Sequence, residues 1–256
     1  MKEIINQVAI DELKAQLSHS SLTPQKRKKL LCKIKKLLFL ITINESIGLI
    51  SDTHIGSKDE NFEYIKKTYD FFYQKGISKV LHTGDLFDGL CEHQNIYEKS
   101  KKNAICQSQL DHLLKEYPGG FENFIILGNH DEDFLRLNDS ILDSLFLDRE
   151  DFIYLGTNVG YLKWYDKTIV MKHQNEDAFA SDLILKGHAH FFSYPEFKKT
   201  LRLPSLSDNH PGKIQNRNQL PGFIICENEN NNYFFDYYIF QEGLMKRVLK
   251  QQFLFH

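Results

Sequence analysis

Five short segments of the 256-residue sequence carry aspartate, histidine or asparagine at spacings suited to metal ligation. In each segment the polar residues directly follow an apolar run, and residues two apart point the same way along an extended chain. Carboxylate, imidazole and amide groups supply the oxygen and nitrogen donors that divalent transition metals bind. The seven predicted ligands are Asp52, His54, Asp85, Asn129, His173, His188 and His190.

This many ligands predicts a centre of two metal ions. Paired ions in hydrolases lie about 3.5–4 Å apart and stabilise the attacking and leaving oxygens of an in-line displacement. Asp85 is the predicted bridge, because one carboxylate can give an oxygen to each ion. The five segments also hold five of the 11 histidines of the chain, so the high histidine content is explained in part by the predicted centre.

The five segments follow five predicted strands, at residues 47–51, 80–83, 124–127, 168–172 and 183–186. In open α/β sheets, ligands bind beyond the carboxyl ends of the strands. Glycines at several of these ends permit close backbone approach and unusual dihedral angles. We therefore expect the five segments to meet at one edge of the fold.

Helices predicted at residues 61–75, 96–117 and 137–146 alternate with the first strands, whereas the second half of the chain is dense in strands. Alternation of strands and helices is typical of an α/β core. The strand-dense half predicts a second sheet packed face to face with the first. The predicted fold is an α/β four-layer α/β/β/α sandwich of two mixed β-sheets flanked by helices, with a short helical N-terminal extension. The predicted boundaries are 1–44 for the extension and 45–256 for the main domain.

In this order, the five segments resemble the motifs of the calcineurin-like metallophosphoesterase superfamily over about residues 46–206. The resemblance implies a first metal ion held by Asp52, His54, Asp85 and His190. It implies a second ion held by Asp85, Asn129, His173 and His188. The segment Leu203-Pro204-Ser205 matches only part of a strand end found in many members.

The resemblance also implies that His130 is the catalytic histidine and that Asp88 is the acid that orients it. Two departures narrow the subfamily, because the Ser/Thr protein phosphatases carry Arg-Gly and Glu where this chain has Gly89-Leu90 and Asp131. The local sequences around Asp52 and Asp85 are closer to the nuclease and phosphodiesterase branches.

These residues predict a metal-dependent hydrolase of phosphoester bonds, most simply a phosphodiesterase. The two ions would generate hydroxide at neutral pH, and His130 would protonate the departing oxygen. The expected cofactors are two divalent metal ions, with manganese first and iron, zinc, cobalt or nickel as alternatives. A DNA or RNA nuclease is the alternative function. A non-catalytic scaffold on the same fold is a third, against which the intact His130 argues.

The formal net charge of -2 combines two unlike parts. Residues 1–44 hold nine Lys and Arg against three Asp and Glu, and the rest of the chain holds 23 against 31. A basic amphipathic helix is predicted from Thr23-Pro24, with an apolar stripe that includes Leu30, Ile34 and Leu38. Its basic residues could be a solvated face, a nucleic-acid contact, or a membrane-surface or partner helix.

The four cysteines, Cys32, Cys91, Cys106 and Cys226, form no C-x-x-C pair and are expected to be reduced thiols. The chain opens without a signal-peptide pattern, and its longest apolar run, residues 37–43, is too short to cross a bilayer. A cytoplasmic protein with a phosphoester substrate, with nucleic acid as a candidate partner and without a membrane partner, is therefore expected. The sequence leaves the oligomeric state open.

Overall fold

The computed structural model describes residues 41–91, 95, 97–137, 139–174, 181–194, 199–208, 217–253 and 255 of the chain. The basic helix predicted after Thr23-Pro24, and all but the last four residues of the predicted extension 1–44, lie outside the described residues. Thr42–Ile43, inside that extension, form strand β1, which pairs in parallel with β6 (Val159–Trp164).

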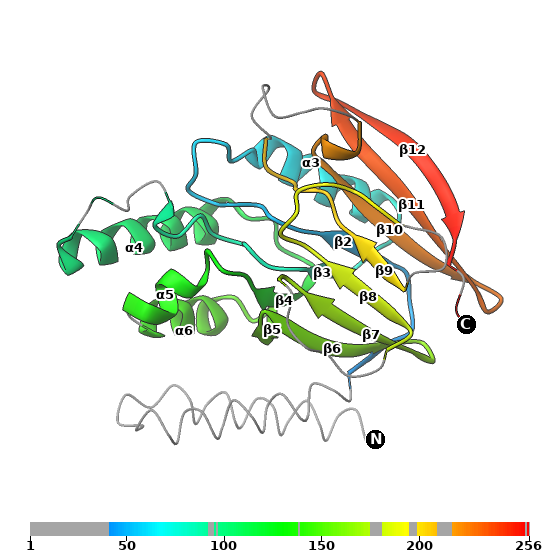
Figure 1. Cartoon of the computed structure of the whole chain (residues 1–256), viewed down its shortest axis with the longest axis horizontal. Helices are drawn as coiled ribbons and strands as arrows, with labels where there is room; N and C mark the ends of the chain where they lie inside the picture. The colour runs from blue at the N-terminus through cyan, green and yellow to red at the C-terminus, as the bar shows by residue number, and fades with distance from the viewer. Residues whose placement is uncertain are drawn as a thin grey trace.

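The strands form two sheets, one of seven strands and one of five (Figure 1). In spatial order, the larger sheet contains β12 (Leu244–Gln252), β11 (Asn232–Gln241), β10 (Gly222–Glu229), β2 (Ile47–Ile50), β3 (Lys79–His82), β4 (Glu122–Leu127) and β5 (Phe152–Thr157). Neighbours from β2 to β5 are parallel, and the pairings that involve β10, β11 and β12 are antiparallel. The sheet is therefore mixed, as predicted.

The smaller sheet contains, in spatial order, β1, β6, β7 (Lys167–Lys172), β8 (Leu183–Lys186) and β9 (Thr200–Arg202). Only the β6–β7 pair is antiparallel, so this sheet is also mixed. The helices among the described residues are α3 (Phe62–Gln74), α4 (Lys99–Glu116), α5 (Glu132–Leu137), α6 (Asp139–Asp148) and the 3₁₀ turn η2 (Arg217–Gln219).

Two hydrophobic cores hold the layers together, because alternate residues of the central strands point to opposite faces. On β4, Ile125 and Leu127 join the core shared with α3, α4, α5 and α6, and those four helices lie together on one side of the strands (Figure 1). Phe124 and Ile126 join the second core, which lies between the two sheets and includes the fully buried Trp164. This packing confirms the predicted sandwich of two mixed sheets with flanking helices.

The predicted strands that carry the site segments are β2, β3, β4, β7 and β8, each within one residue at its carboxyl end. A tight turn joins β10 to β11, with Asn230 and Asn231 at φ 53° and 65°, as in a type I′ hairpin. Four elements of the described residues were not predicted: β1, α5, η2 and β12. Strand β12 is largely exposed and rich in Lys and Arg, so it lacks the alternation of a half-buried strand.

Within the described part of the chain, no helix combines the length and the apolar character needed to span a membrane.

Candidate metal centre

All seven predicted ligands lie together beyond the carboxyl ends of five strands. Strands β2, β3 and β4 are parallel neighbours, and so are β7 and β8 of the other sheet. The segments that follow them therefore emerge at the same edge, where the two sheets meet. The structure thus brings the predicted ligands together as the strand-end pattern indicated.

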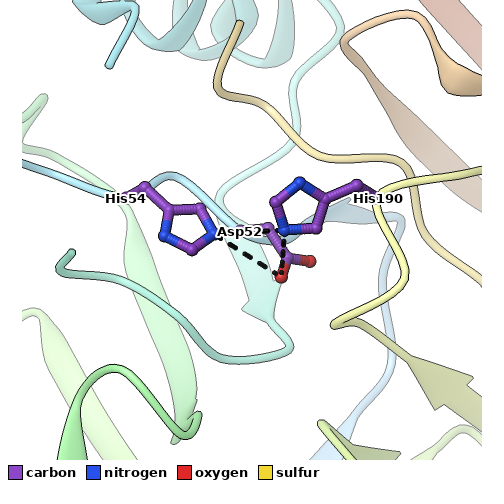
Figure 2. Close-up of side chains that lie close together, drawn as sticks. All are labelled: Asp52, His54 and His190. Atoms are coloured by element: carbon purple, nitrogen blue, oxygen red, sulfur yellow. Dashed lines mark hydrogen bonds and ion pairs between the residues drawn. The ribbon is translucent and has the colours of Figure 1, made fainter. Parts of the chain in front are cut away.

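A first group of ligand atoms comes from Asp52, His54 and His190. The Nε2 atom of His190 lies 3.3 Å from Asp52 Oδ1 and 3.2 Å from His54 Nε2. Figure 2 shows both imidazole rings facing the same oxygen of the Asp52 carboxylate, Oδ1. Asp52 accepts the hydroxyl hydrogen bond of Ser51 and the backbone N–H of His188, which hold its carboxylate in place.

A second group comes from Asp85, His173 and His188. The Nε2 atom of His173 lies 2.9 Å from Asp85 Oδ2 and 3.1 Å from Asn129 Oδ1. Its Nδ1 atom donates to the Thr83 carbonyl at 2.9 Å, which fixes the tautomer and aims Nε2 at the acidic oxygens. This orientation is the one that a metal-binding imidazole requires.

The carboxylate of Asp85 lies between the two groups. Its Oδ2 atom is 2.9 Å from His173 Nε2 and 3.8 Å from His54 Nε2. Its Oδ1 atom accepts the backbone N–H of His130 at 3.0 Å. Asp85 is therefore in the position that the predicted bridging role requires.

Five of the seven ligands have a left-handed backbone. The φ angles are 52° at Asp52, 45° at His54, 52° at Asp85, 69° at His188 and 54° at His190. Residues other than glycine seldom adopt such angles, and when they do they cluster at functional sites, where surrounding structure stabilises the strain. Left-handed backbone is thus concentrated at the predicted ligands, which supply five of the ten non-glycine examples among the described residues.

Two glycines allow the segments to approach each other closely. Gly84 has a φ of 101°, and a Cβ atom there would lie 2.6 Å from His173 Nδ1. A Cβ atom at Gly128 would overlap the Asp85 carboxylate. Any side chain at either position would displace a predicted ligand, so glycine is required at both.

The charges of the site are balanced by its histidines. Burial raises the pKa of the Asp52 carboxyl, but the charges of His190, His173 and His54 outweigh that effect and hold it well below its usual value. Burial lowers the pKa of the His173 imidazole, but Asp85 and Asp52 outweigh that effect and raise it to about 9. Without metal, a protonated His173 therefore supplies positive charge between two ionised carboxylates. A bound cation would take over that role.

Buried side chains that the sequence analysis did not select hold the ligand loops in place. His82 is fully buried, and burial lowers its pKa to about 4, so its ring is neutral. It accepts the Gly84 N–H at Nδ1 and contacts Thr53 Oγ1 at 3.1 Å through Nε2, which links the β2 and β3 loops. A histidine inside the apolar run of β3 was the available signal.

Asp131 is a second supporting residue. It accepts backbone N–H groups of Leu86, Phe87 and Gly128, which joins the loop after β3 to the loop after β4. Burial, and then the charge of Asp85, raises the pKa of Asp131 to about 6. The sequence analysis used this residue only to separate subfamilies.

His130 and Asp88 lie beside the ligands, with one difference from the expected contact. The Nδ1 atom of His130 donates to the backbone carbonyl of Asp88 at 2.9 Å, whereas the Asp88 carboxylate is 3.8 Å away. That carboxylate lies 3.5 Å from Nδ1 of His54. Asp88 therefore contacts the predicted catalytic histidine mainly through its carbonyl and a predicted ligand through its side chain.

The site opens into a cavity of about 560 Å³. His54, Asp85, His130, His188 and His190 line it on the ligand side. Ser57, Lys58, Cys91, Ser207 and Asp208 are among the other lining residues. The cavity gives a small molecule, or the end of a longer one, access to the side chains of both ligand groups.

Comparison with known proteins agrees with this arrangement. The model of the calcineurin-like phosphoesterase family matches residues 46–220, which is more than half of the chain. The two-sheet fold with ligands at its strand ends is that of the metallophosphoesterases. The chain belongs to the calcineurin-like phosphoesterase family.

Several solved structures are similar in fold. Vacuolar protein sorting 29 from Cryptosporidium parvum is 14% identical, with a TM-score of 0.49, and the match covers 82% of this chain and 98% of that one. Wild-type Vps29 from Entamoeba histolytica, complexed with Zn²⁺, is 14% identical, with a TM-score of 0.45 and coverages of 81% and 98%. The nuclease MPE from Pseudomonas putida is 13% identical, with a TM-score of 0.37 and coverages of 79% and 87%. A search of curated proteins found no match.

Proposed function

We propose that the protein is a metal-dependent phosphodiesterase. The observation that carries the proposal is that all seven predicted ligands and His130 lie together at one edge of the fold, most of them lining a single cavity. A scaffold protein would have no need for the five left-handed ligand residues or for a histidine poised beside them.

The donor set fits two divalent transition ions. Asp52, His54, Asp85 and His190 would hold one, and Asp85, Asn129, His173 and His188 the other. Imidazole, carboxylate and amide donors suit manganese, our first expectation, as well as iron, zinc, cobalt or nickel. When bound, such a pair of ions supplies a strong nucleophile at neutral pH and positive charge that faces the phosphate oxygens.

His130 is the proposed proton donor. A carbonyl oxygen can only accept, so the contact with Asp88 O places one proton on Nδ1 of His130. The other nitrogen, Nε2, lies 4.0 Å from Asp85 Oδ2 on the cavity side. In the cationic ring, Nε2 carries a second proton. As the bond from phosphorus to the leaving oxygen breaks, that oxygen keeps the electron pair and takes the Nε2 proton.

The test is a substrate panel on manganese-reconstituted protein. It would include a nitrophenyl phosphodiester, a nitrophenyl phosphomonoester, a cyclic nucleotide, a dinucleotide, single- and double-stranded DNA, and RNA. We expect the small phosphodiesters to be hydrolysed faster than the monoester. Absence of turnover on every substrate, with both metal ions bound by elemental analysis, would contradict the proposal.

A nuclease is the second candidate, favoured by the basic composition of residues 1–44. A protein that neutralises phosphates with Lys and Arg binds DNA more weakly as salt rises. A nuclease should therefore show a steep salt dependence that weakens when the seven basic residues between Lys26 and Lys36 are neutralised. A small-substrate enzyme should not. We also propose a cytoplasmic location and a phosphoester substrate, with nucleic acid as a candidate partner and no membrane partner.

A further inference from the structure

The loop after β3 carries Asp85 and Asp88, and its backbone is held almost entirely by other segments. Two N–H groups at its start donate to Asp131, and the N–H of Leu90 donates to Asp133 at 2.9 Å. The N–H of Asp88 donates to the Ile55 carbonyl at 3.0 Å. The N–H of Gly89 is bound by a residue of helix α4.

That residue is Gln109, which forms two hydrogen bonds with the same glycine. Its Oε1 atom accepts the Gly89 N–H at 3.0 Å, and its Nε2 atom donates to the Gly89 carbonyl at 2.8 Å. The side chain is only 4% exposed and packs against Gly56, where a Cβ atom would overlap it. Gln109 is therefore wedged between the loop that carries His54 and the loop that carries Asp88.

The Gly89 N–H belongs to the same peptide unit as the Asp88 carbonyl. A trans peptide is planar, so its N–H and C=O point in opposite directions and rotate together. The N–H side is bound by Gln109, and the C=O side accepts Nδ1 of His130 at 2.9 Å. Rotation of this one peptide plane would weaken both bonds at once. Hydrogen bonds in such a chain also polarise and strengthen one another.

We propose that Gln109 is a positioning residue for His130, acting through the Asp88–Gly89 peptide. The proposal rests on the proposed function only for the role of His130 as proton donor. The orientation of His130 can be measured without any substrate. Replacing Gln109 should lower turnover most on substrates whose leaving oxygen depends most on protonation.

The test compares Gln109→Met with Gln107→Met, an exposed glutamine on the same helix whose side chain binds only Asp111 among the described contacts. Two phosphodiesters with a shared phosphoryl group would be used, one with a nitrophenyl leaving group and one with an alkyl leaving group. Because general acid catalysis contributes about 10²–10⁴-fold, we expect Gln109→Met to lower kcat by about 10- to 100-fold on the alkyl substrate and by no more than about 3-fold on the nitrophenyl one. Gln107→Met should change neither.

A second measurement keeps this proposal separate from the proposed function. In metal-free protein with ¹⁵N-labelled histidine, the His130 Nδ1 signal should shift in Gln109→Met and stay fixed in Gln107→Met. If Gln109→Met does not fold, Gln109→Glu keeps an oxygen for the Gly89 N–H but places a second acceptor against the Gly89 carbonyl, so it should shift the His130 signal and give the same leaving-group pattern as expected for Gln109→Met. An unchanged His130 signal, or an equal loss on both substrates, would overturn the proposal. If the wild-type protein hydrolyses no phosphodiester, only the proposed function fails.

Discussion

Strand β2 and the segment that follows it differ in backbone conformation and in polarity, although together they span only eight residues. From Ile47 to Ile50 the chain is regular, apolar and fully buried between its neighbours. At Asp52 and His54 it becomes left-handed and polar, and His54 lines the cavity. The same change occurs after β3 and β8. The core between the sheets stabilises the fold. The strained ends of the strands present the predicted ligands and lower the stability of the fold.

If the strand ends act as one centre, removal of the shared carboxylate should have the largest effect. We expect Asp85→Asn to lower turnover by more than about 10³-fold, because a two-ion mechanism needs both ions in place. Elemental analysis should show loss of metal from both positions. The matched control is Asp208→Asn, which changes another acid of the same cavity. Full metal content in Asp85→Asn would show that Asp85 is not the bridge.

Truncation of a side chain in the core between the sheets should lower the stability of the fold but not kcat. Trp164 is fully buried in that core, and its indole N–H donates to the Glu45 carbonyl at 2.9 Å. Replacing a buried tryptophan by alanine costs about 3–5 kcal/mol of unfolding free energy. Denaturant unfolding of Trp164→Ala should show that loss, while kcat of the folded fraction at low temperature stays near the wild-type value. A large fall in kcat without a fall in stability would contradict the division between core and strand ends.

The pH dependence of the metal-free protein should reveal the charge stored at the strand ends. The pKa of His173 is about 9 in the folded protein against an ordinary value of 6.5. Between pH 6.5 and about 9, His173 therefore holds its proton in the folded state and has lost it in the unfolded state. The stability due to His173 is fully present below about 6.5 and disappears as pH rises to about 9.

Thermal unfolding of metal-free protein should accordingly show a lower midpoint at pH 9 than at pH 6.5. His173→Gln should lack this fall, whereas His112→Gln, at a half-exposed position on α4, should keep it. The metal-loaded protein should lack it too, because a metal ligand gives up that proton on binding. The same midpoint at both pH values in the metal-free wild type would argue against a protonated His173.

The sequence predicted that these seven side chains lie together, because the signal is local. Each one follows an apolar strand, and the carboxyl ends of parallel strands share an edge whatever the details of the loops. Gln109 carries no such signal, and the sequence does not show what His82 and Asp131 contact, since the roles of all three depend on residues 20 to 45 positions away. Local pattern identified the predicted ligands but not the buried residues that hold their loops.

The difference between local and long-range signals also explains which strands and helices were not predicted. Strands buried on both faces, such as β3 and β4, have continuous apolar runs that were predicted to within two residues. Strand β12 pairs only with β11 and carries Lys246, Arg247 and Lys250, so its extended form depends on a partner strand. Helix α5 has only six residues, too few to show a helical period.

The measurement that tests the account most directly is turnover and metal content of His130→Ala, compared with the wild-type protein after identical manganese loading. Loss of a positioned proton donor should lower kcat on an alkyl phosphodiester by about 10²–10⁴-fold. Both proteins should hold the same amount of metal by elemental analysis. The hydrogen bond from His130 to the Asp85 carboxylate comes from the backbone N–H, which the alanine variant keeps. An unchanged kcat, or a loss of metal equal to that of Asp85→Asn, would contradict the claim that the strand ends form a metal centre with a separate catalytic histidine.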